Sequence, residues 1–191
     1  MKRCRIIFSG SGGQGIITAA WLLAETAALY EGLNAVQSQS YGPEARGGAC
    51  RSDVIISDTE ILFPKVTQPN VIISLSQEAY NTYSNLIRPG GLLLLDRYYV
   101  QQEKKVDARQ IELAMYEAVL KEIKNPIVYN LCVLGALIYF IPLVQQASLD
   151  RVLKNHFPTS LLPVNKRAFQ LGQQLAEKYA VENGFSNIEL W

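Results

Sequence analysis

A glycine-rich turn near the N-terminus carries the clearest chemical signal in this 191-residue sequence. The turn consists of Gly10, Ser11, Gly12, Gly13, Gln14 and Gly15. Residues 4–9 before it are typical of a short buried strand, and residues 14–31 are typical of a helix. In a strand–turn–helix unit, several backbone N–H groups and the positive end of the helix dipole point at one spot. Because glycine accepts positive φ angles and lets a ligand approach the backbone closely, the turn predicts a phosphate or pyrophosphate site.

The spacing of Gly10, Gly12 and Gly15 fits the G-x-G-x-x-G pattern of dinucleotide-binding proteins. Such a site also needs an acidic residue about 20 positions on, at the end of the second strand, to bind the ribose hydroxyls. The second expected strand, residues 34–39, ends in Ser and Gln, and Glu31 precedes it. An NAD- or FAD-binding domain therefore remains an alternative that lacks this partner. A glycine turn that binds no ligand is a second alternative. The sequence lacks the G-x-x-x-x-G-K-[ST] spacing of P-loop NTPases, which argues against that class.

A second glycine-rich segment, residues 41–48, follows the second expected strand. The carboxyl ends of the strands of an open α/β sheet line one crevice, so this segment should open onto the same edge as the first turn. Arg46 could then make a bidentate contact to a phosphate, and Tyr41 could stack on a flat ring. The alternative is that Arg46 pairs with a carboxylate such as Glu44 and that the glycines only build turns.

Composition narrows the class of protein. Hydrophobic residues make up 49% of the chain and the net charge is +1, which gives no electrostatic reason to expect nucleic acid. Cys4, Cys50 and Cys132 lie far apart and form no C-x-x-C, so neither a zinc site nor an iron–sulfur cluster is indicated. Reduced thiols and the lack of a signal-peptide pattern favour a cytoplasmic protein. The single histidine, His156, is expected to be structural.

The order of elements predicts an α/β fold. Residues 52–57 and 60–63 flank Asp58-Thr59 and predict a β-hairpin, which favours a mixed sheet. Further strands are expected at residues 71–75 and 92–95, and helices at 77–86, 106–123, 149–157 and 163–183. We therefore expect a three-layer αβα sandwich, with a mostly parallel sheet that contains a hairpin and a helical C-terminal part. No linker or repeat divides the chain, so residues 1–191 should form one domain.

The segment 127–144 is nearly all apolar and almost long enough to cross a bilayer. Asn130 and Gly135 interrupt it, and Pro142 should end or kink any helix. We expect a buried helix, in the core or against another protein, and no membrane insertion. Gly135 would let a neighbouring element approach closely.

Four stretches of the sequence together resemble one protein family. They are FSGSGGQGIITAAWLLAETAA, QSYGPEARGGACRSDVIIS, NLCVLGAL and NKRAFQLG. They are similar to the gamma subunit of 2-oxoacid:ferredoxin oxidoreductases, and SYGPEARGG looks closest to the 2-oxoglutarate type. The resemblance covers nearly the whole chain. It implies a non-catalytic subunit of an enzyme that oxidatively decarboxylates a 2-oxoacid, such as pyruvate or 2-oxoglutarate, to an acyl-CoA and reduces ferredoxin.

The resemblance also implies a ligand and partners. Gly10–Gly15 would cradle the phosphates of coenzyme A, and Ser40, Tyr41 and Arg46 would line the same mouth. Thiamine diphosphate and the iron–sulfur clusters would belong to partner subunits, namely alpha, beta and a ferredoxin-like delta subunit. The isolated chain could form a homodimer in their place. A subunit needed only for assembly, with an empty glycine turn, is the remaining alternative.

Overall fold

A computed structural model describes residues 3–40, 49–184 and 188 of the chain. Its strands are β1 (Arg3–Gly10), β2 (Asn34–Ser40), β3 (Cys50–Ser57), β4 (Val71–Ser74), β5 (Gly91–Asp96) and β6 (Ala108–Leu113). Its α-helices are α1 (Ile16–Tyr30), α2 (Gln77–Tyr83), α3 (Met115–Ala118), α4 (Tyr129–Phe140), α5 (Gln146–His156) and α6 (Leu162–Glu182). A π-helical turn, Val119–Ile123, extends α3.

The six strands form one mixed sheet in the order β2-β3-β1-β4-β5-β6. β1, β4, β5 and β6 pair in parallel along the sheet. β3 is antiparallel to both β1 and β2, so β2 runs in the same direction as β1. The expectation of a mostly parallel, mixed sheet is confirmed, and the carboxyl ends of five of the six described strands lie at one edge.

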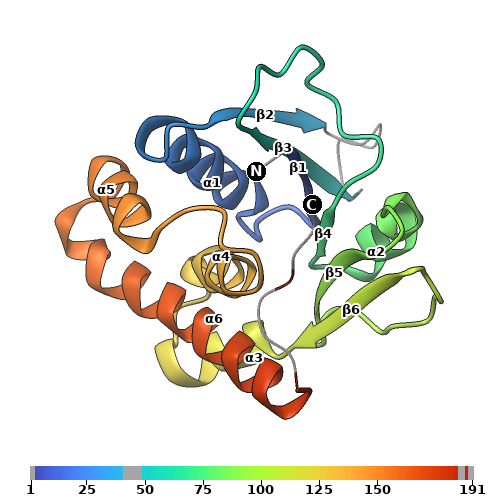
Figure 1. Cartoon of the computed structure of the whole chain (residues 1–191). Helices are drawn as coiled ribbons and strands as arrows, with labels where there is room; N and C mark the ends of the chain where they lie inside the picture. Colours follow the sequence, from blue (N-terminus) through green and yellow to red (C-terminus); the bar gives the residue numbers. More distant parts are fainter. Residues whose placement is uncertain (1–2, 41–48, 185–187, 189–191) are drawn as a thin grey trace.

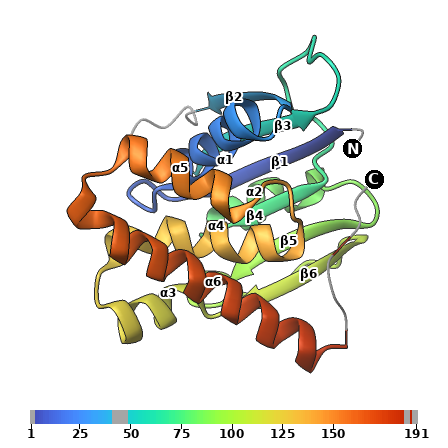
Figure 2. The same ribbon diagram turned by 60° about the vertical axis from the view of Figure 1, so that its left-hand side comes forward.

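Helices cover both faces of the sheet, as expected for a three-layer fold. The larger core lies on one face, where α1 and α4 pack under α5 and α6 (Figures 1 and 2). The opposite face carries α2, whose Tyr80 is fully buried in a smaller core with Ile7, Ile72 and Leu93. Ser76 caps the start of α2 by accepting a hydrogen bond from the backbone N–H of Ala79 at 3.2 Å.

The expected buried helix in the apolar segment is confirmed as α4, which packs in the chain's own core between α1 and α6. Two glycines permit its contact with α6: a Cβ on Gly135 would meet the backbone carbonyl of Phe169, and one on Gly172 would meet that of Cys132. The described part of the chain contains no helix that meets the length and hydropathy needed to span a bilayer.

The hairpin predicted at residues 52–57 and 60–63 is wrong in its position, because the consecutive strands that pair antiparallel are β2 and β3. Residues 60–63 form no strand, and Leu62 and Phe63 are exposed. The β-branched strand β3 instead inserts between β1 and β2, where both of its edges are paired. Because each edge of β3 already has a partner, no edge is left for residues 60–63.

The predicted helix over residues 106–123 is also wrong in its first half. Residues 108–113 form β6, the parallel strand at the sheet edge beside β5. Its inward residues, Ile111 and Leu113, alternate with polar ones because only part of an edge strand is covered. Helical structure starts only at Met115. The helices expected near the C-terminus are confirmed as α5 and α6.

Candidate functional site

The glycine turn lies where the connections of the sheet diverge. β1 and β4 are parallel neighbours, but β1 leads into α1 on one face and β4 leads into α2 on the other (Figure 1). Open α/β sheets bind ligands in the crevice at such a point. The Ser9 hydroxyl donates to the Ile73 carbonyl at 2.7 Å, and the Leu75 N–H donates to the Ser9 carbonyl at 2.9 Å. These buried bonds hold the two strand ends together directly beneath the turn.

Gln14 ties the turn across this crevice. Its Oε1 accepts a hydrogen bond from the Ser11 N–H at 2.7 Å, and its Nε2 donates to the Leu75 carbonyl at 2.7 Å. A Cβ on Gly10 would touch the same Gln14 Oε1, so glycine is required there for the bridge to form. The Gln14 side chain therefore shapes the turn, and both its amide oxygen and its amide nitrogen are already bonded within the chain.

Two glycines of the turn adopt left-handed backbone angles. Gly13 has φ 87° and Gly15, the N-cap residue of α1, has φ 71°. No side chain caps α1, and its first internal hydrogen bond runs from the Ala19 N–H to the Gly15 carbonyl at 3.0 Å. The N–H groups of the first helical turn thus have no helical acceptor and suit an anion.

These N–H groups border a depression of about 260 Å³. The described residues that line it are uncharged: Ser11, Gly12, Gly13, Gly15, Ile16, Ile17, Thr18 and Cys50. The donors are backbone amides and the Ser and Thr hydroxyls, which fit phosphate oxygens and carry out no acid–base chemistry. The site can bind and orient an anionic group.

The second glycine-rich segment, residues 41–48, lies outside the described residues, and only the backbone of the neighbouring Ser40 is described. The backbone of Ser40 ends β2 at the same sheet edge as Gly10: Ser40 pairs with Arg51 and Gly10 with Cys50, so one strand separates them. At the usual spacing between strands, this places the two backbones roughly 10 Å apart. Tyr41 and Arg46 lie outside the described residues.

Among the described residues, none at the carboxyl end of β2 is the acidic residue that a dinucleotide site needs. Glu31 lies at the opposite end of β2, where its Oε1 accepts a hydrogen bond from the Gln145 N–H at 2.8 Å. The described residues at the carboxyl end of β2 are Gln39 and Ser40, neither of them acidic.

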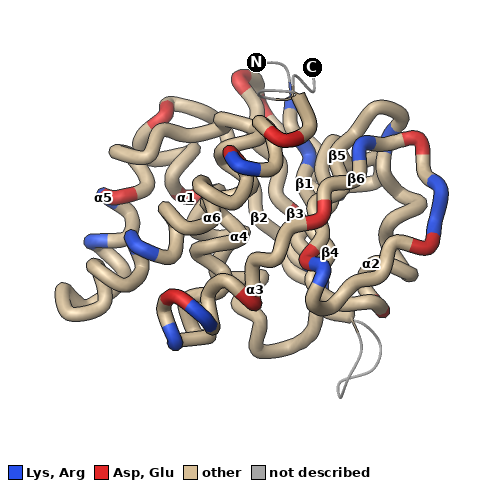
Figure 3. Tube along the Cα trace, turned by 90° about the horizontal axis from the view of Figure 1, so that it is seen from below, with Lys and Arg blue, Asp and Glu red and all other residues tan. Residues whose placement is uncertain are grey.

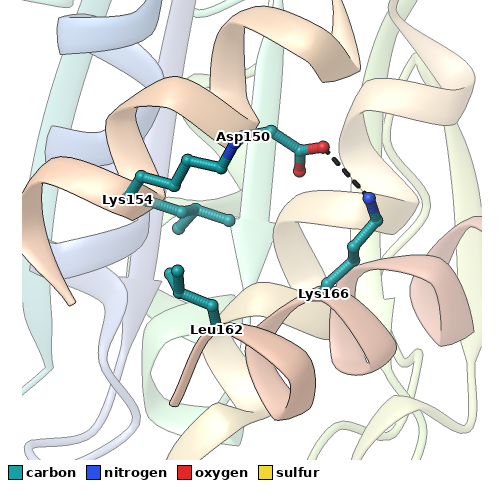
Figure 4. Close-up of a pocket in the computed structure, with 5 residues that line it drawn as sticks. Asp150, Lys154, Leu162 and Lys166 are labelled. Carbon is teal, nitrogen blue, oxygen red and sulfur yellow. Dashed lines mark hydrogen bonds and ion pairs between the residues drawn. The ribbon is translucent and has the colours of Figure 1, made fainter. Parts of the chain in front are cut away.

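Two other depressions have different chemistry. One of about 520 Å³ borders β2, β3 and residues 64–67. Two cations, Arg51 and Lys65, line it, and Arg51 binds the Asp53 carboxylate at 2.6 and 2.8 Å and the Val66 carbonyl at 2.6 Å. The other, of about 110 Å³ between α5 and α6, is bordered by an ion pair of 3.2 Å between Lys166 and Asp150 (Figure 4). Neither depression shares a residue with the glycine turn.

A buried carboxylate, Asp96, lies at the carboxyl end of β5. Its Oδ2 accepts hydrogen bonds from the Tyr129 hydroxyl at 2.7 Å and the Tyr116 N–H at 2.8 Å, and its Oδ1 accepts one from the Tyr98 N–H at 2.9 Å. Burial raises the pKa of Asp96 above its ordinary value, although these bonds oppose the shift. Asp96 anchors the first residue of α4, and Asn130, next in the chain, lies against Gly15 of the turn. The sequence marks Asn130 only as a polar break in an apolar run.

The remaining titratable groups are dispersed. His156 contacts Glu25 of α1 at 2.8 Å and packs edge-on against Trp21, so it ties α5 to α1. Within the described ranges, no three His, Cys, Asp or Glu side chains come together as a metal site. Figure 3 shows Lys and Arg interspersed with Asp and Glu, without a face of one sign in that view.

Comparison with known proteins identifies the class. The family model described as pyruvate ferredoxin/flavodoxin oxidoreductase matches residues 5–175, and the chain belongs to this family. Within the family it is similar to 2-oxoglutarate synthase subunit KorC of Methanocaldococcus jannaschii, with 42% identity over 178 residues that cover 92% of this chain and 95% of the relative. The resemblance to gamma subunits is confirmed.

Solved structures of related proteins have the same fold as this chain. The keto/oxoacid ferredoxin oxidoreductase gamma subunit from Geobacter sulfurreducens PCA aligns with a TM-score of 0.86 and 35% identity, over 94% of this chain and 99% of that one. The fold also recurs in 2-oxoglutarate:ferredoxin oxidoreductase from Magnetococcus marinus, whose structure holds 2-oxoglutarate, coenzyme A and succinyl-CoA. That alignment has a TM-score of 0.83 and 24% identity, and covers 99% of this chain and 33% of the other.

Proposed function

We propose that this chain is the gamma subunit of a 2-oxoglutarate:ferredoxin oxidoreductase and that its glycine turn binds the phosphates of coenzyme A. One observation carries the proposal: a cradle of backbone N–H groups, at the N-terminus of α1, faces a depression at the point where the sheet connections diverge. The likeness to the KorC relatives over nearly their full length supports the choice of 2-oxoglutarate.

In this proposal the chain binds and orients coenzyme A and does no bond chemistry. Gly10–Gly15 hold the phosphates, and Gln14 keeps the turn in shape through its bonds to Ser11 and Leu75. Ser40, Tyr41 and Arg46 complete the mouth of the site. The thiol end of coenzyme A then extends away from this chain toward the acyl group, which a partner subunit forms.

The partners supply the chemistry. Alpha, beta and ferredoxin-like delta subunits carry thiamine diphosphate and the iron–sulfur clusters, which provide decarboxylation and electron transfer to ferredoxin. The complex belongs in the cytoplasm, and the three free cysteines of this chain suit a reducing compartment.

The first experiment is to purify the tagged chain from its native cell with its partners and to follow dye reduction. We expect thiamine diphosphate and iron–sulfur subunits to copurify, and activity to require coenzyme A and 2-oxoglutarate in preference to pyruvate. Recovery of the chain alone, or activity independent of coenzyme A, would contradict the proposal.

A variant tests the turn itself. A Cβ on Gly12 has open space around it, so Gly12→Asp fits sterically and places a negative charge in the cradle. We expect the KM for coenzyme A to rise about tenfold or more, the loss typical of a hydrogen bond to a charged group. Asn125→Asp adds the same charge beside α4, where the side chain caps a short helical turn, and serves as the control. An unchanged KM in Gly12→Asp would remove the turn from the coenzyme A site.

A further inference from the structure

The glycine turn is held from two sides. On the side of the crevice, the Gln14 side chain ties the turn to the Leu75 carbonyl at the end of β4. On the side of the core, α4 packs beside α1 (Figures 1 and 2), and the Cβ, Cγ and Nδ2 atoms of Asn130 each lie 2.9 Å from the point that a Cβ on Gly15 would occupy. The position of the turn therefore depends on the position of α4.

Gly15 connects this support to the candidate site. It lines the depression, it is the N-cap residue of α1, and its backbone is left-handed with φ 71°. No side chain caps α1, so none holds the first N–H groups of the helix in place. A shift of the side chain packed behind Gly15 would therefore move the N–H groups that border the depression.

A buried hydrogen bond at the end of β5 sets the position of α4. Tyr129 is the first residue of the helix, and its hydroxyl donates to Asp96 Oδ2 at 2.7 Å. Asp96 is fully buried and is itself fixed by the backbone N–H groups of Tyr116, at 2.8 Å, and Tyr98, at 2.9 Å. Since a hydrogen bond is stronger in the low dielectric of the interior than in water, this one holds the start of α4 firmly against the sheet.

We propose that Asp96 is a positioning residue for the glycine turn. Through Tyr129 and the adjoining Asn130 it holds Gly15, and with it the backbone N–H groups, in the arrangement that binds the phosphates of coenzyme A. This inference rests on the proposed function. Asp96 is not among the described residues that line the depression, so it acts through the residues of α4 and not by touching the ligand.

The test removes the hydroxyl that makes the bond. Tyr129→Phe keeps the ring and its packing, while Asp96→Asn changes the acceptor. Tyr80→Phe is the matched control: its hydroxyl is bonded to the Lys104 N–H at 3.0 Å and to Gln110 at 3.2 Å, and its buried ring packs on the opposite face of the sheet. Wild type and variants are assayed as the assembled complex, and the KM for coenzyme A, the KM for 2-oxoglutarate and kcat are measured separately.

A positioning role predicts a specific pattern. Tyr129→Phe and Asp96→Asn should each raise the KM for coenzyme A about three- to tenfold, a part of the loss that follows when a hydrogen bond to a charged group is removed outright. The KM for 2-oxoglutarate and kcat at saturation should stay unchanged. Because the two residues act through one bond, the double variant should raise the KM for coenzyme A no further than the larger single effect. Tyr80→Phe should leave that KM unchanged.

The outcomes separate the two proposals. If Gly12→Asp raises the KM for coenzyme A in the same assay while Tyr129→Phe and Asp96→Asn leave it unchanged, Asp96 is a structural anchor alone and the coenzyme A site stands. Additive effects in the double variant, or an equal rise in Tyr80→Phe, would also overturn the positioning role. If Gly12→Asp leaves the KM unchanged, the coenzyme A site fails, and the inference on Asp96 fails with it.

Discussion

The three glycines at the centre and end of the turn should respond very differently to alanine. A Cβ on Gly12 meets nothing within 4 Å, and its backbone is not left-handed. Gly13 has equally open space but φ 87°. Gly15 combines φ 71° with a clash 2.9 Å from Asn130. The series thus separates backbone strain from steric overlap.

The expected free energies follow from these contacts. Gly12→Ala should change the free energy of unfolding by less than about 1 kcal/mol, because the substitution mainly restricts the unfolded chain. Gly13→Ala should cost about 1–2 kcal/mol for an L-residue in the left-handed region. Gly15→Ala adds overpacking of roughly 1–3 kcal/mol against an atom fixed on α4, for a total of about 2–5 kcal/mol.

Urea denaturation of the full chain, followed by circular dichroism, measures all three. In thermal melts, Gly15→Ala should lower Tm by roughly 4–20 °C for a chain of this size. Equal stabilities of Gly12→Ala and Gly15→Ala would refute both the left-handed conformation of Gly15 and its contact with α4. A loss in Gly12→Ala as large as that in Gly13→Ala would show that strain does not set the order.

Three further predictions concern other parts of the molecule. Gly135→Ala should destabilise the chain by about 1–3 kcal/mol in urea denaturation, because a backbone carbonyl of α6 occupies the place of the new Cβ. The better helix propensity of alanine does not offset this overlap. A stability equal to that of wild type would contradict the contact between α4 and α6. Asp96→Asn should cost about 1–3 kcal/mol because its single oxygen cannot replace both carboxylate oxygens, so an NH2 group would face either the Tyr98 N–H or the donors Tyr116 and Tyr129. Burial raises the pKa of Asp96 in the folded state, so the contribution of Asp96 to the free energy of unfolding is fully present below its ordinary pKa of 3.8 and is lost as pH rises through the folded pKa. In melts at stepped pH, the stability advantage of wild type over Asp96→Asn should therefore shrink across that window. A difference that does not change with pH would contradict the raised pKa. Ellman's reagent should titrate one thiol per native chain, Cys50, and Cys50→Ser should abolish that reaction; rapid reaction of Cys4 or Cys132 would mean that the core opens.

Local sequence signals were sufficient for the first unit of the fold. The apolar strand, the glycine turn and the start of α1 follow one another without long-range help, because glycine conformation and helix periodicity are local properties. The α4 helix was predictable for a similar reason: its residues are apolar on every side, which only a buried helix of this length tolerates.

Long-range pairing was not predictable in the same way. Strand β3 is followed by a short apolar stretch that would suit a hairpin, and nothing local shows that β1 and β2 take both of its edges. Strand β6 has a half-covered face, so its mixture of charged and apolar residues imitates an amphipathic helix. In both cases tertiary pairing overrides the local pattern.

The same distinction holds for the candidate site. The residues of the glycine turn can be recognised from their types and spacing. The backbone of Ser40 lies at the expected sheet edge because β2 is parallel to β1. The position of Asn130 beside Gly15 depends on how α4 packs against α1, which no spacing in the sequence encodes. Its only sequence signal is an amide in a run of apolar residues.

The order of strands in the sheet also governs when the site is completed during synthesis. β1 leaves the ribosome first but lies in the middle of the sheet, so it must wait for β3 and β4 to pair with its two edges. The sheet then grows outward through β5 and β6 in chain order. The residue that packs behind Gly15 is made after all the described strands, at the start of α4. A nascent chain that ends before residue 129 holds all six described strands but lacks the α4 residue that packs against Gly15, so the back of the glycine turn is closed only after the sheet is complete.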